Sequence, residues 1–129
     1  MNERFFGAWL LESFESERTD GTRTRPWGDD PLGMIVWDPT GHFAVQVGPR
    51  QADRSDAYVS FFGTAYTDDD GESGTIVLRV GGSSAPERVG GDQVRRFLFV
   101  DADVLRMRPP VGPDGSQSTF TWRRAPAVV

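Results

Sequence analysis

The connections between the strand-like segments of this chain fall into two length classes, and that sorting constrains its fold most. Eight runs rich in Val, Ile, Phe, Trp and Thr, bounded by Gly, Pro and Asp, are typical of β-strands. Tight turns at 38–41, 68–73 and 101–103 join the second run to the third, the fourth to the fifth and the sixth to the seventh. The predicted strands are 7–15, 33–38, 41–47, 58–67, 74–80, 92–100, 103–109 and 117–124.

Longer segments make the other four connections, and they alternate with the tight turns along the chain. In an up-and-down meander, alternate connections lie at the same end of the sheet, so all long loops share one end. Eight antiparallel strands that close on themselves form a barrel wide enough for one small ligand. The sequence therefore predicts an all-β fold, an eight-stranded up-and-down antiparallel barrel, as a single domain over residues 1–129, with a floor at the tight turns and a mouth at the long loops. The long connections are 16–32, 48–57, 81–91 and 110–116.

An eight-stranded sandwich is the alternative to the barrel, and it would not require the loop lengths to be sorted by end. No segment shows sustained periodicity of 3.6 residues, so little helix is expected. The best candidate for a short helical turn lies between Gln51 and Ala57.

The composition excludes several kinds of chemistry. Cysteine is absent, which excludes disulfides and thiolate chemistry, and all 14 basic residues are arginine, which excludes a Schiff-base lysine. A single histidine, His42, cannot build a multi-histidine metal site, and we expect neither metal nor cofactor. The formal charge of −5 argues against nucleic acid or an anionic membrane as the main partner. Without an apolar membrane span or a signal peptide, we expect a cytoplasmic protein. We also expect a monomer or a homodimer.

The two ends of the chain carry residues with a family resemblance. Gly7-Ala8-Trp9 begins the first strand and Trp122-Arg123-Arg124 ends the last one, where alternation puts Phe120 and Trp122 inward and Arg124 on the face of Trp122. This arrangement resembles the Gly-x-Trp and arginine signature of lipocalins, in which the arginine packs over the tryptophan and closes the barrel. The resemblance implies that Trp9, Trp122 and Arg124 form a structural barrel floor.

Further segments extend the resemblance over nearly the whole chain, to the small bacterial and fungal lipocalin-like domain family of calycin-type β-barrels. The family often carries a His-His pair after Gly-Thr-Val, whereas here Gly74-Thr75-Ile76-Val77 is followed by Leu78 and Arg79, so no property of that pair is carried over. The matching segments are Phe6–Glu15, Pro26–Gly28, Gly33–Gly41, Phe43–Gln46, Phe61–Thr64 and Trp122–Arg124.

Two adjacent arginines, Arg95 and Arg96, lie in the middle of a predicted strand, so regular alternation turns one of them inward. Arg95 shares its face with Phe97 and Phe99, and this bulkier set should take the interior. A buried guanidinium is costly without a carboxylate, which would come from the protein, for example Glu12 or Glu15, or from a ligand. A bulge that turns both arginines outward is the alternative.

The leading functional hypothesis is the binding of a small, largely hydrophobic ligand, with or without an acidic or enolic group, inside the barrel. Nine Phe, four Trp and two Tyr supply the aromatic area that such a cavity needs. The alternation is ambiguous in strands 33–38 and 58–67, where Ile35, Trp37, Tyr58, Phe61 and Tyr66 are the alternative liners. The expected ligand-binding residues are Leu11, Ser13, Met34, Val36, Phe43, Val45, Phe62, Arg79, Arg95, Phe97, Phe99, Leu105, Met107 and Phe120.

Two other functional hypotheses stay open. One is a cofactor-independent cyclase or isomerase in natural-product biosynthesis, acting on a polyketide- or terpenoid-like intermediate. Such an enzyme needs mainly a shaped cavity and a few polar groups, for example Tyr58, Tyr66, Glu12 or an inward arginine. The other is an interaction module with a filled core. The sequence assigns no catalytic residue, and His42 is expected to have a structural or surface role.

Overall fold

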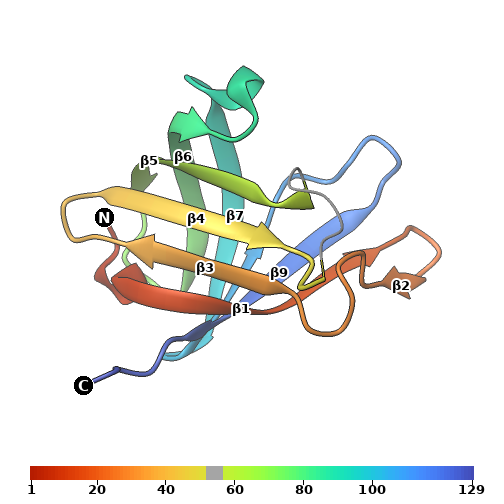
Figure 1. Cartoon of the computed structure of the whole chain (residues 1–129), viewed down its shortest axis with the longest axis horizontal. Coiled ribbons are helices and arrows are strands. Elements are labelled where there is room, and N and C mark those ends of the chain that lie inside the picture. The colour runs from red at the N-terminus through yellow and green to blue at the C-terminus, as the bar shows by residue number, and fades with distance from the viewer. Residues whose placement is uncertain (52–56) are drawn as a thin grey trace.

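The computed structural model describes residues 1–51 and 57–129 (Figure 1). Most of this chain forms β-strands, because apolar and polar side chains alternate along it. Short 3₁₀ segments, η1 (Glu3–Phe5) and η3 (Pro86–Arg88), add turns outside the sheet. The short helical turn expected between Gln51 and Ala57 falls largely outside the described residues. The strands are β1 (Gly7–Glu17), β2 (Arg23–Thr24), β3 (Leu32–Trp37), β4 (His42–Gly48), β5 (Val59–Thr67), β6 (Ser73–Ser83), β7 (Asp92–Asp101), β8 (Val104–Arg108) and β9 (Gln117–Arg124).

Strands β1 and β3 to β9 form one antiparallel meander, and pairing of β1 with β9 closes it into an eight-stranded barrel. The predicted fold is therefore confirmed. The short β2 was not predicted; it lies inside the first long connection and pairs with the end of β1. The tight turns and the long loops fall at opposite ends of this meander, as the sorting of loop lengths indicated.

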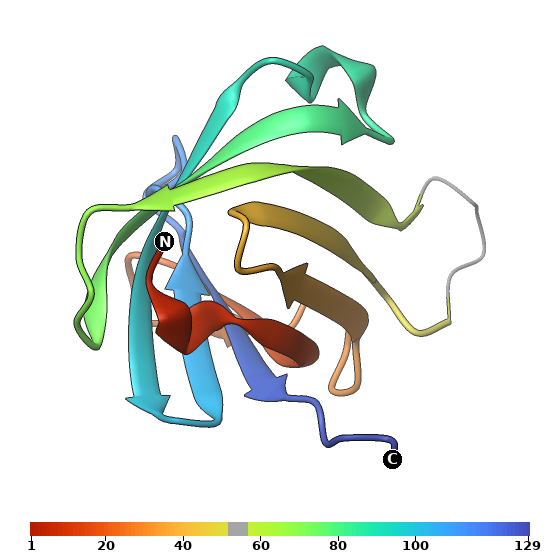
Figure 2. The ribbon, with the colours of Figure 1, turned by 90° about the vertical axis from the view of Figure 1, so that its left-hand side faces the viewer.

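The N-terminal segment covers the floor of the barrel, as Figure 2 shows. The Asn2 side chain donates hydrogen bonds to the carbonyl oxygens of Asp69 and Gly71 in the β5–β6 turn. These bonds hold η1 over the opening, and Phe5 at the end of η1 lies in the interior, where it is fully buried. Its ring meets those of Trp37, Phe97 and Phe99 at centroid distances of 5.0, 4.9 and 4.9 Å. This plug was not predicted from the sequence.

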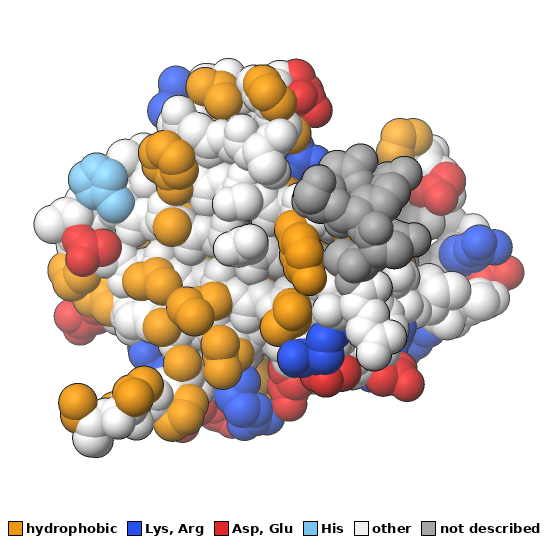
Figure 3. Space-filling view, in the orientation of Figure 1, with side chains coloured by type: hydrophobic (Ala, Val, Ile, Leu, Met, Phe, Trp, Pro, Cys, Tyr) orange, Lys and Arg blue, Asp and Glu red, His pale blue; other side chains and the backbone are white. Residues whose placement is uncertain are grey.

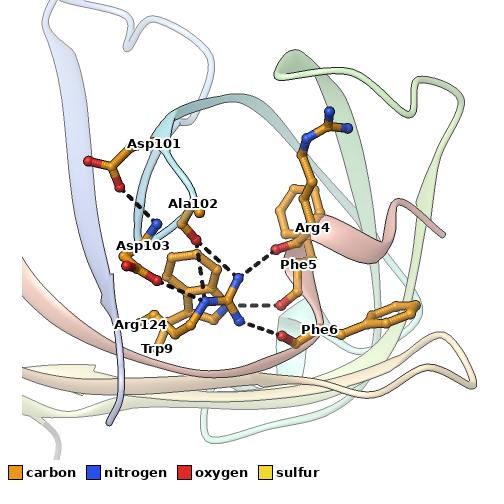
Figure 4. Close-up of polar contacts among 8 residues, drawn as sticks. All are labelled: Arg4, Phe5, Phe6, Trp9, Asp101, Ala102, Asp103 and Arg124. Carbon is orange, nitrogen blue, oxygen red and sulfur yellow. Dashed lines mark hydrogen bonds and ion pairs between the residues drawn. The ribbon is translucent and has the colours of Figure 1, made fainter.

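Arg124 and Trp9 meet beside the floor in the arrangement that the lipocalin resemblance implies (Figure 4). The Arg124 guanidinium lies 4.2 Å from the centre of the Trp9 ring, and it donates hydrogen bonds to the carbonyl oxygens of Phe6 at 2.7 Å and Ala102 at 3.2 Å. Gly7 has a φ of +114°, and a Cβ there would lie 3.3 Å from Arg124 Nη1. The Gly-x-Trp motif therefore leaves the space that the arginine occupies.

A β-bulge in β1 corrects the prediction for Ser13. The ladder between β1 and β9 shifts register between Leu11 and Ser13, so Glu12 is an extra residue. Beyond it, Ser13 lies on the outer face together with Glu12, and Phe14 takes the inward position that regular alternation had given to Ser13.

Strands β3 and β5 settle the ambiguous alternation in favour of three of the alternative residues, whereas Tyr66 is exposed and Tyr58 lines an outer hollow. Ile35, Trp37 and Phe61 are buried, because the larger side chains fill the interior. The inward orientation expected for three residues was wrong: Met34, Val36 and Phe62 are 47%, 40% and 58% exposed. Figure 3 shows the hydrophobic side chains gathered on this outer face.

The inward orientation expected for Arg79 was wrong as well. On β6, Ile76, Leu78 and Val80 are buried, so the residues between them face solvent. Arg79 lies outside and forms an ion pair with Asp92 of β7, with 3.1 Å between Nε and Oδ1.

The floor and the mouth of the barrel are expected to differ in their rates of amide exchange. We expect the backbone amides of residues 25–31, which connect β2 to β3 at the mouth, to exchange faster than those of the turns at 38–41 and 101–103. The floor turns are tied to their neighbours, for example by the Ala65 amide bonding the Gly41 carbonyl at 2.8 Å and the Arg124 amide bonding the Asp103 carbonyl at 2.9 Å. Hydrogen exchange measured by mass spectrometry would contradict this assignment of floor and mouth if the floor turns exchanged faster.

Candidate functional site

A cavity of about 270 Å³ lies in the mouth half of the barrel. Three of the long connections reach it, through Trp27, Arg88 and Pro109. Its wall is mostly apolar, and the charged or polar side chains among its described liners are Arg88, Gln93, Arg95 and Ser118. The lining residues are Phe14, Trp27, Ile35, Val45, Val47, Val59, Phe61, Leu78, Arg88, Gln93, Arg95, Met107, Pro109, Ser118, Phe120 and Trp122.

Other hollows lie on the outside of the barrel. One of about 330 Å³ adjoins Arg4 and Arg124 at the floor, and one of about 410 Å³ lies between Met34 and Tyr58. Both are bounded by outward-facing or end-of-barrel residues. The mouth cavity is the better site for a small apolar ligand, because inward-facing residues of the barrel enclose it and the lining is predominantly apolar.

Three aromatic rings form one wall of the cavity. Phe14 of β1 stacks on Phe120 of β9 with 4.4 Å between ring centroids and 16° between planes. Trp27, from the loop before β3, lies 4.5 Å from Phe14 and 6.1 Å from Phe120. Trp27 therefore anchors the first long connection at the mouth, where a flat apolar molecule would find aromatic contacts.

Arg95 faces into the cavity, as predicted, because β7 keeps a regular ladder with β6 through this position. Its guanidinium donates to two neutral acceptors, the Val94 carbonyl oxygen at 2.9 Å and Gln93 Oε1 at 2.7 Å. Burial lowers the pKa of Arg95, and the charge of the nearby Arg88 lowers this pKa further. The site is thus a positively charged spot in a mostly apolar wall.

No ion pair joins Arg95 to a carboxylate within the part of the chain that the structure describes. The two protein carboxylates considered from the sequence are engaged elsewhere. Glu12 pairs with Arg123 at 3.0 Å, and Glu15 pairs with Arg25 at 3.0 Å, both away from the cavity lining.

The structure divides the predicted ligand-binding residues into three groups. Val45, Arg95, Met107 and Phe120 line the cavity. The second group is buried in the barrel but does not line the cavity; it consists of Leu11, Phe43, Phe97, Phe99 and Leu105. The third group lies on the outside: Ser13, Met34, Val36, Phe62 and Arg79.

Several liners were missed, for different reasons. Phe14 required knowledge of the bulge, and Trp122 was assigned to the floor alone. Leu78 had a usable signal, because the polar Arg79 separates it from Val80 and so puts Leu78 and Val80 on the same face. Gln93 shares the face of Arg95 and follows from the same alternation.

Comparisons with known proteins agree with this fold. The family model of the lipocalin-like domain matches residues 6–57, which include β1 to β4. A de novo designed fluorescence-activating β-barrel is similar in structure, with a TM-score of 0.54 and 16% sequence identity over 96% of each chain. No curated protein matches. The lipocalin-like resemblance predicted from the residues is confirmed, and a barrel of this kind suggests binding of a hydrophobic ligand. Among the described residues, no helix is both long enough and apolar enough to span a membrane.

Proposed function

We propose that this lipocalin-like barrel binds a small, largely hydrophobic molecule whose acidic or enolic oxygen meets Arg95. The observation that carries the proposal is the inward guanidinium, which has neutral hydrogen-bond partners and apolar neighbours. A ligand oxygen with negative charge would supply the counter-charge that the described residues do not. Arg88 stands at the same cavity and would add to the attraction.

The dimensions of the cavity favour a compact ligand. A volume of about 270 Å³ lies near the lower end of ligand cavities, which span roughly 300–1,000 Å³. One or two fused rings suit this space and the aromatic wall better than a long acyl chain. Burial of apolar area would drive binding, at about 25 cal/mol per Å² before the costs of association.

The cyclase or isomerase hypothesis receives less support from the geometry. Glu12, Tyr58 and Tyr66, its named sources of a proton or a hydrogen bond, do not line the cavity. Tyr66 is 65% exposed, and Tyr58 lines the outer hollow beside Met34. Only Arg95 remains from that set of candidates, and a single arginine serves binding as well as catalysis. The third hypothesis, an interaction module, assumed a filled core. Side chains fill the floor half of the barrel, whereas the mouth half contains the cavity.

The test compares 2-naphthoic acid with methyl 2-naphthoate, bound to the wild-type protein and to Arg95→Met. Methionine keeps much of the length of the arginine stem and removes its charge. We expect the acid to lose about tenfold or more in affinity, since a hydrogen bond to a charged group contributes roughly 1.5–3 kcal/mol, and the ester to lose less than about twofold. Both probes carry a fluorescent naphthalene ring, so their own emission is a suitable first readout.

The matched control is Arg96→Met, because Arg96 is adjacent in sequence and exposed on the outer face. This variant should bind both probes as the wild-type protein does. Equal losses for acid and ester in Arg95→Met, or no loss for the acid, would leave a plain apolar cavity without an acid-binding group.

A further inference from the structure

Two adjacent rows of side chains cross the outside of β1, β3, β4 and β5, with one residue from each strand in each row. In the first row, Val36 pairs with Ala8 on one side and with Ala44 on the other, and Ala44 pairs in turn with Phe62. The second row crosses the same strands two residues away. The eight residues are called the β1–β5 face: Ala8, Val36, Ala44 and Phe62 in the first row, and Leu10, Met34, Gln46 and Ser60 in the second.

The β1–β5 face is exposed, mostly apolar and uncharged. Leu10, Met34 and Phe62 are 43%, 47% and 58% exposed, and Figure 3 shows hydrophobic side chains gathered over these strands. Charged residues make up 26% of the chain, yet the eight residues of the face include none. The exposed apolar area of the face is on the order of 400 Å², which lies within the roughly 300–600 Å² of the largest patches on single proteins. Patches of this size often bind a partner.

Exposed apolar residues on β7 differ from this face, because arginines lie among them. Val94 and Leu98 are 42% and 44% exposed, but Arg96 lies between them on the same side of the strand. Leu98 also pairs with Arg106 of β8. A partner that covered Leu98 would have to bury guanidinium groups as well, which is costly. The β1–β5 face carries no such cost.

The order of side-chain sizes across the β1–β5 face fits a second copy of the same chain. A two-fold axis parallel to the strands, between β3 and β4, places β5 of each copy over β1 of the other, and β4 over β3. In the first row, Phe62 then lies over Ala8 of the partner copy, and Val36 lies over Ala44. Each of these contacts joins a larger and a smaller side chain, as packed sheet faces require. In the second row, the larger apolar side chains come from β1 and β3 and lie over the polar ones of β4 and β5.

Charge also favours a second copy over a highly charged partner. The net charge of −5 makes two copies repel each other where their charged surfaces meet, and an uncharged face lets them approach without bringing carboxylates together. A highly charged partner would find no counter-charge on the face. A standard interface buries roughly 800 Å² per partner, so the β1–β5 face would form its apolar centre and the surrounding polar residues its rim.

We propose that the chain forms a two-fold symmetric homodimer through the β1–β5 face. The proposal is independent of the ligand site, because the face points away from the cavity, which is lined by alternate residues of the same strands such as Ile35 and Val45. Because the apolar centre is small, we expect a dissociation constant on the order of 10 μM.

Sedimentation equilibrium tests the dimer, with Val36→Arg and Val94→Arg as a matched pair. The two valines lie on strands and are 40% and 42% exposed, and each substitution makes the net charge less negative. Greater repulsion between whole molecules therefore cannot explain a loss of association. We expect Val36→Arg to raise the dissociation constant about tenfold or more, because it presses a guanidinium against Ala44 of the partner copy. Val94→Arg should associate as the wild-type protein does, and circular dichroism checks that both variants fold.

The predicted contact between Val36 and Ala44 also allows a rescue experiment. Ala44→Glu should lose its own dimer, and an equimolar mixture with Val36→Arg should form a heterodimer in which one guanidinium meets one carboxylate. If both variants are monomeric and their mixture is too, the proposed two-fold arrangement is wrong. A wild-type protein that stays monomeric up to about 1 mM would overturn the dimer and leave the face to a different partner. Association that survives in Val36→Arg, or that is lost in Val94→Arg, would overturn it by placing the contact on another surface.

Discussion

Trp9→Ala is expected to lower the free energy of unfolding by about 3–5 kcal/mol, the range for removal of a large aromatic side chain from a packed core. Trp9 is fully buried, its Nε1 donates to the Phe5 carbonyl oxygen at 2.8 Å, and its ring carries Arg124 at 4.2 Å. The substitution removes all of these contacts at the point where β1 and β9 close the barrel. Urea denaturation followed by tryptophan fluorescence and circular dichroism would measure the loss, and the thermal midpoint should fall by roughly 10–20 °C.

Trp27→Ala is the matched control, since the same side chain is removed from the mouth. Trp27 is only partly buried and packs against two phenylalanines, so a much smaller loss of stability is expected there. An unchanged midpoint in Trp9→Ala, or equal losses in the two variants, would show that the lipocalin-type floor does not hold this barrel together.

The parts of the fold that could be predicted from the sequence are those fixed by chain connectivity and by gross side-chain size. The sorted loop lengths were enough to indicate a meander with a floor and a mouth. Arg124 could be matched to Trp9 because both lie near strand ends that the closed topology brings together. Arg95 could be turned inward because Phe97 and Phe99 are bulkier than the residues on the other face of that strand.

The same size argument applies to β3 and would have been correct there. Ile35 and Trp37 together are larger than Met34 and Val36, and they occupy the interior. Both faces of this strand are apolar, so hydrophobic alternation alone carries no information on its orientation. On such a strand the volume that the core must fill decides, and the medium-sized apolar side chains remain outside.

Two features depend on interactions between distant parts of the chain, which no local sequence pattern indicates. The bulge at Glu12 exchanges Ser13 for Phe14 on the inner face, and it is a property of the ladder between β1 and β9. The plug formed by Phe5 depends on Asn2 finding the carbonyl oxygens of a turn more than 60 residues away in the chain. Cavity liners near these features were therefore misplaced or missed.

Apart from Trp122, the floor and the mouth use different residues, which separates stability from binding along the barrel. The rings of Phe5, Phe97 and Phe99 pack on one another at the floor and do not line the cavity. The cavity is lined instead by Phe14, Phe120 and the polar residues around Arg95. Substitutions at the two ends should therefore have distinct effects.

Phe5→Ala is expected to lower the free energy of unfolding by about 3–5 kcal/mol, as for other large-to-small changes in a packed core. The variant leaves a void between Trp37, Phe97 and Phe99, whose rings now lie 4.9–5.0 Å from that of Phe5. Under conditions where it is folded, its affinity for 2-naphthoic acid should stay within about twofold of the wild-type value. Denaturant titration and fluorescence binding measure the two quantities on the same sample.

Phe6→Ala is the neighbouring control, because Phe6 is less buried than Phe5 and the carbonyl oxygen that accepts from Arg124 belongs to its backbone and is retained. It should cost clearly less stability than Phe5→Ala. A tenfold loss of probe affinity in folded Phe5→Ala would contradict the separation, since the plug would then shape the cavity through Phe97 and Met107, which face each other across β7 and β8. If the packed floor and the mouth cavity act separately, Phe5→Ala loses much stability and keeps its affinity for the probe.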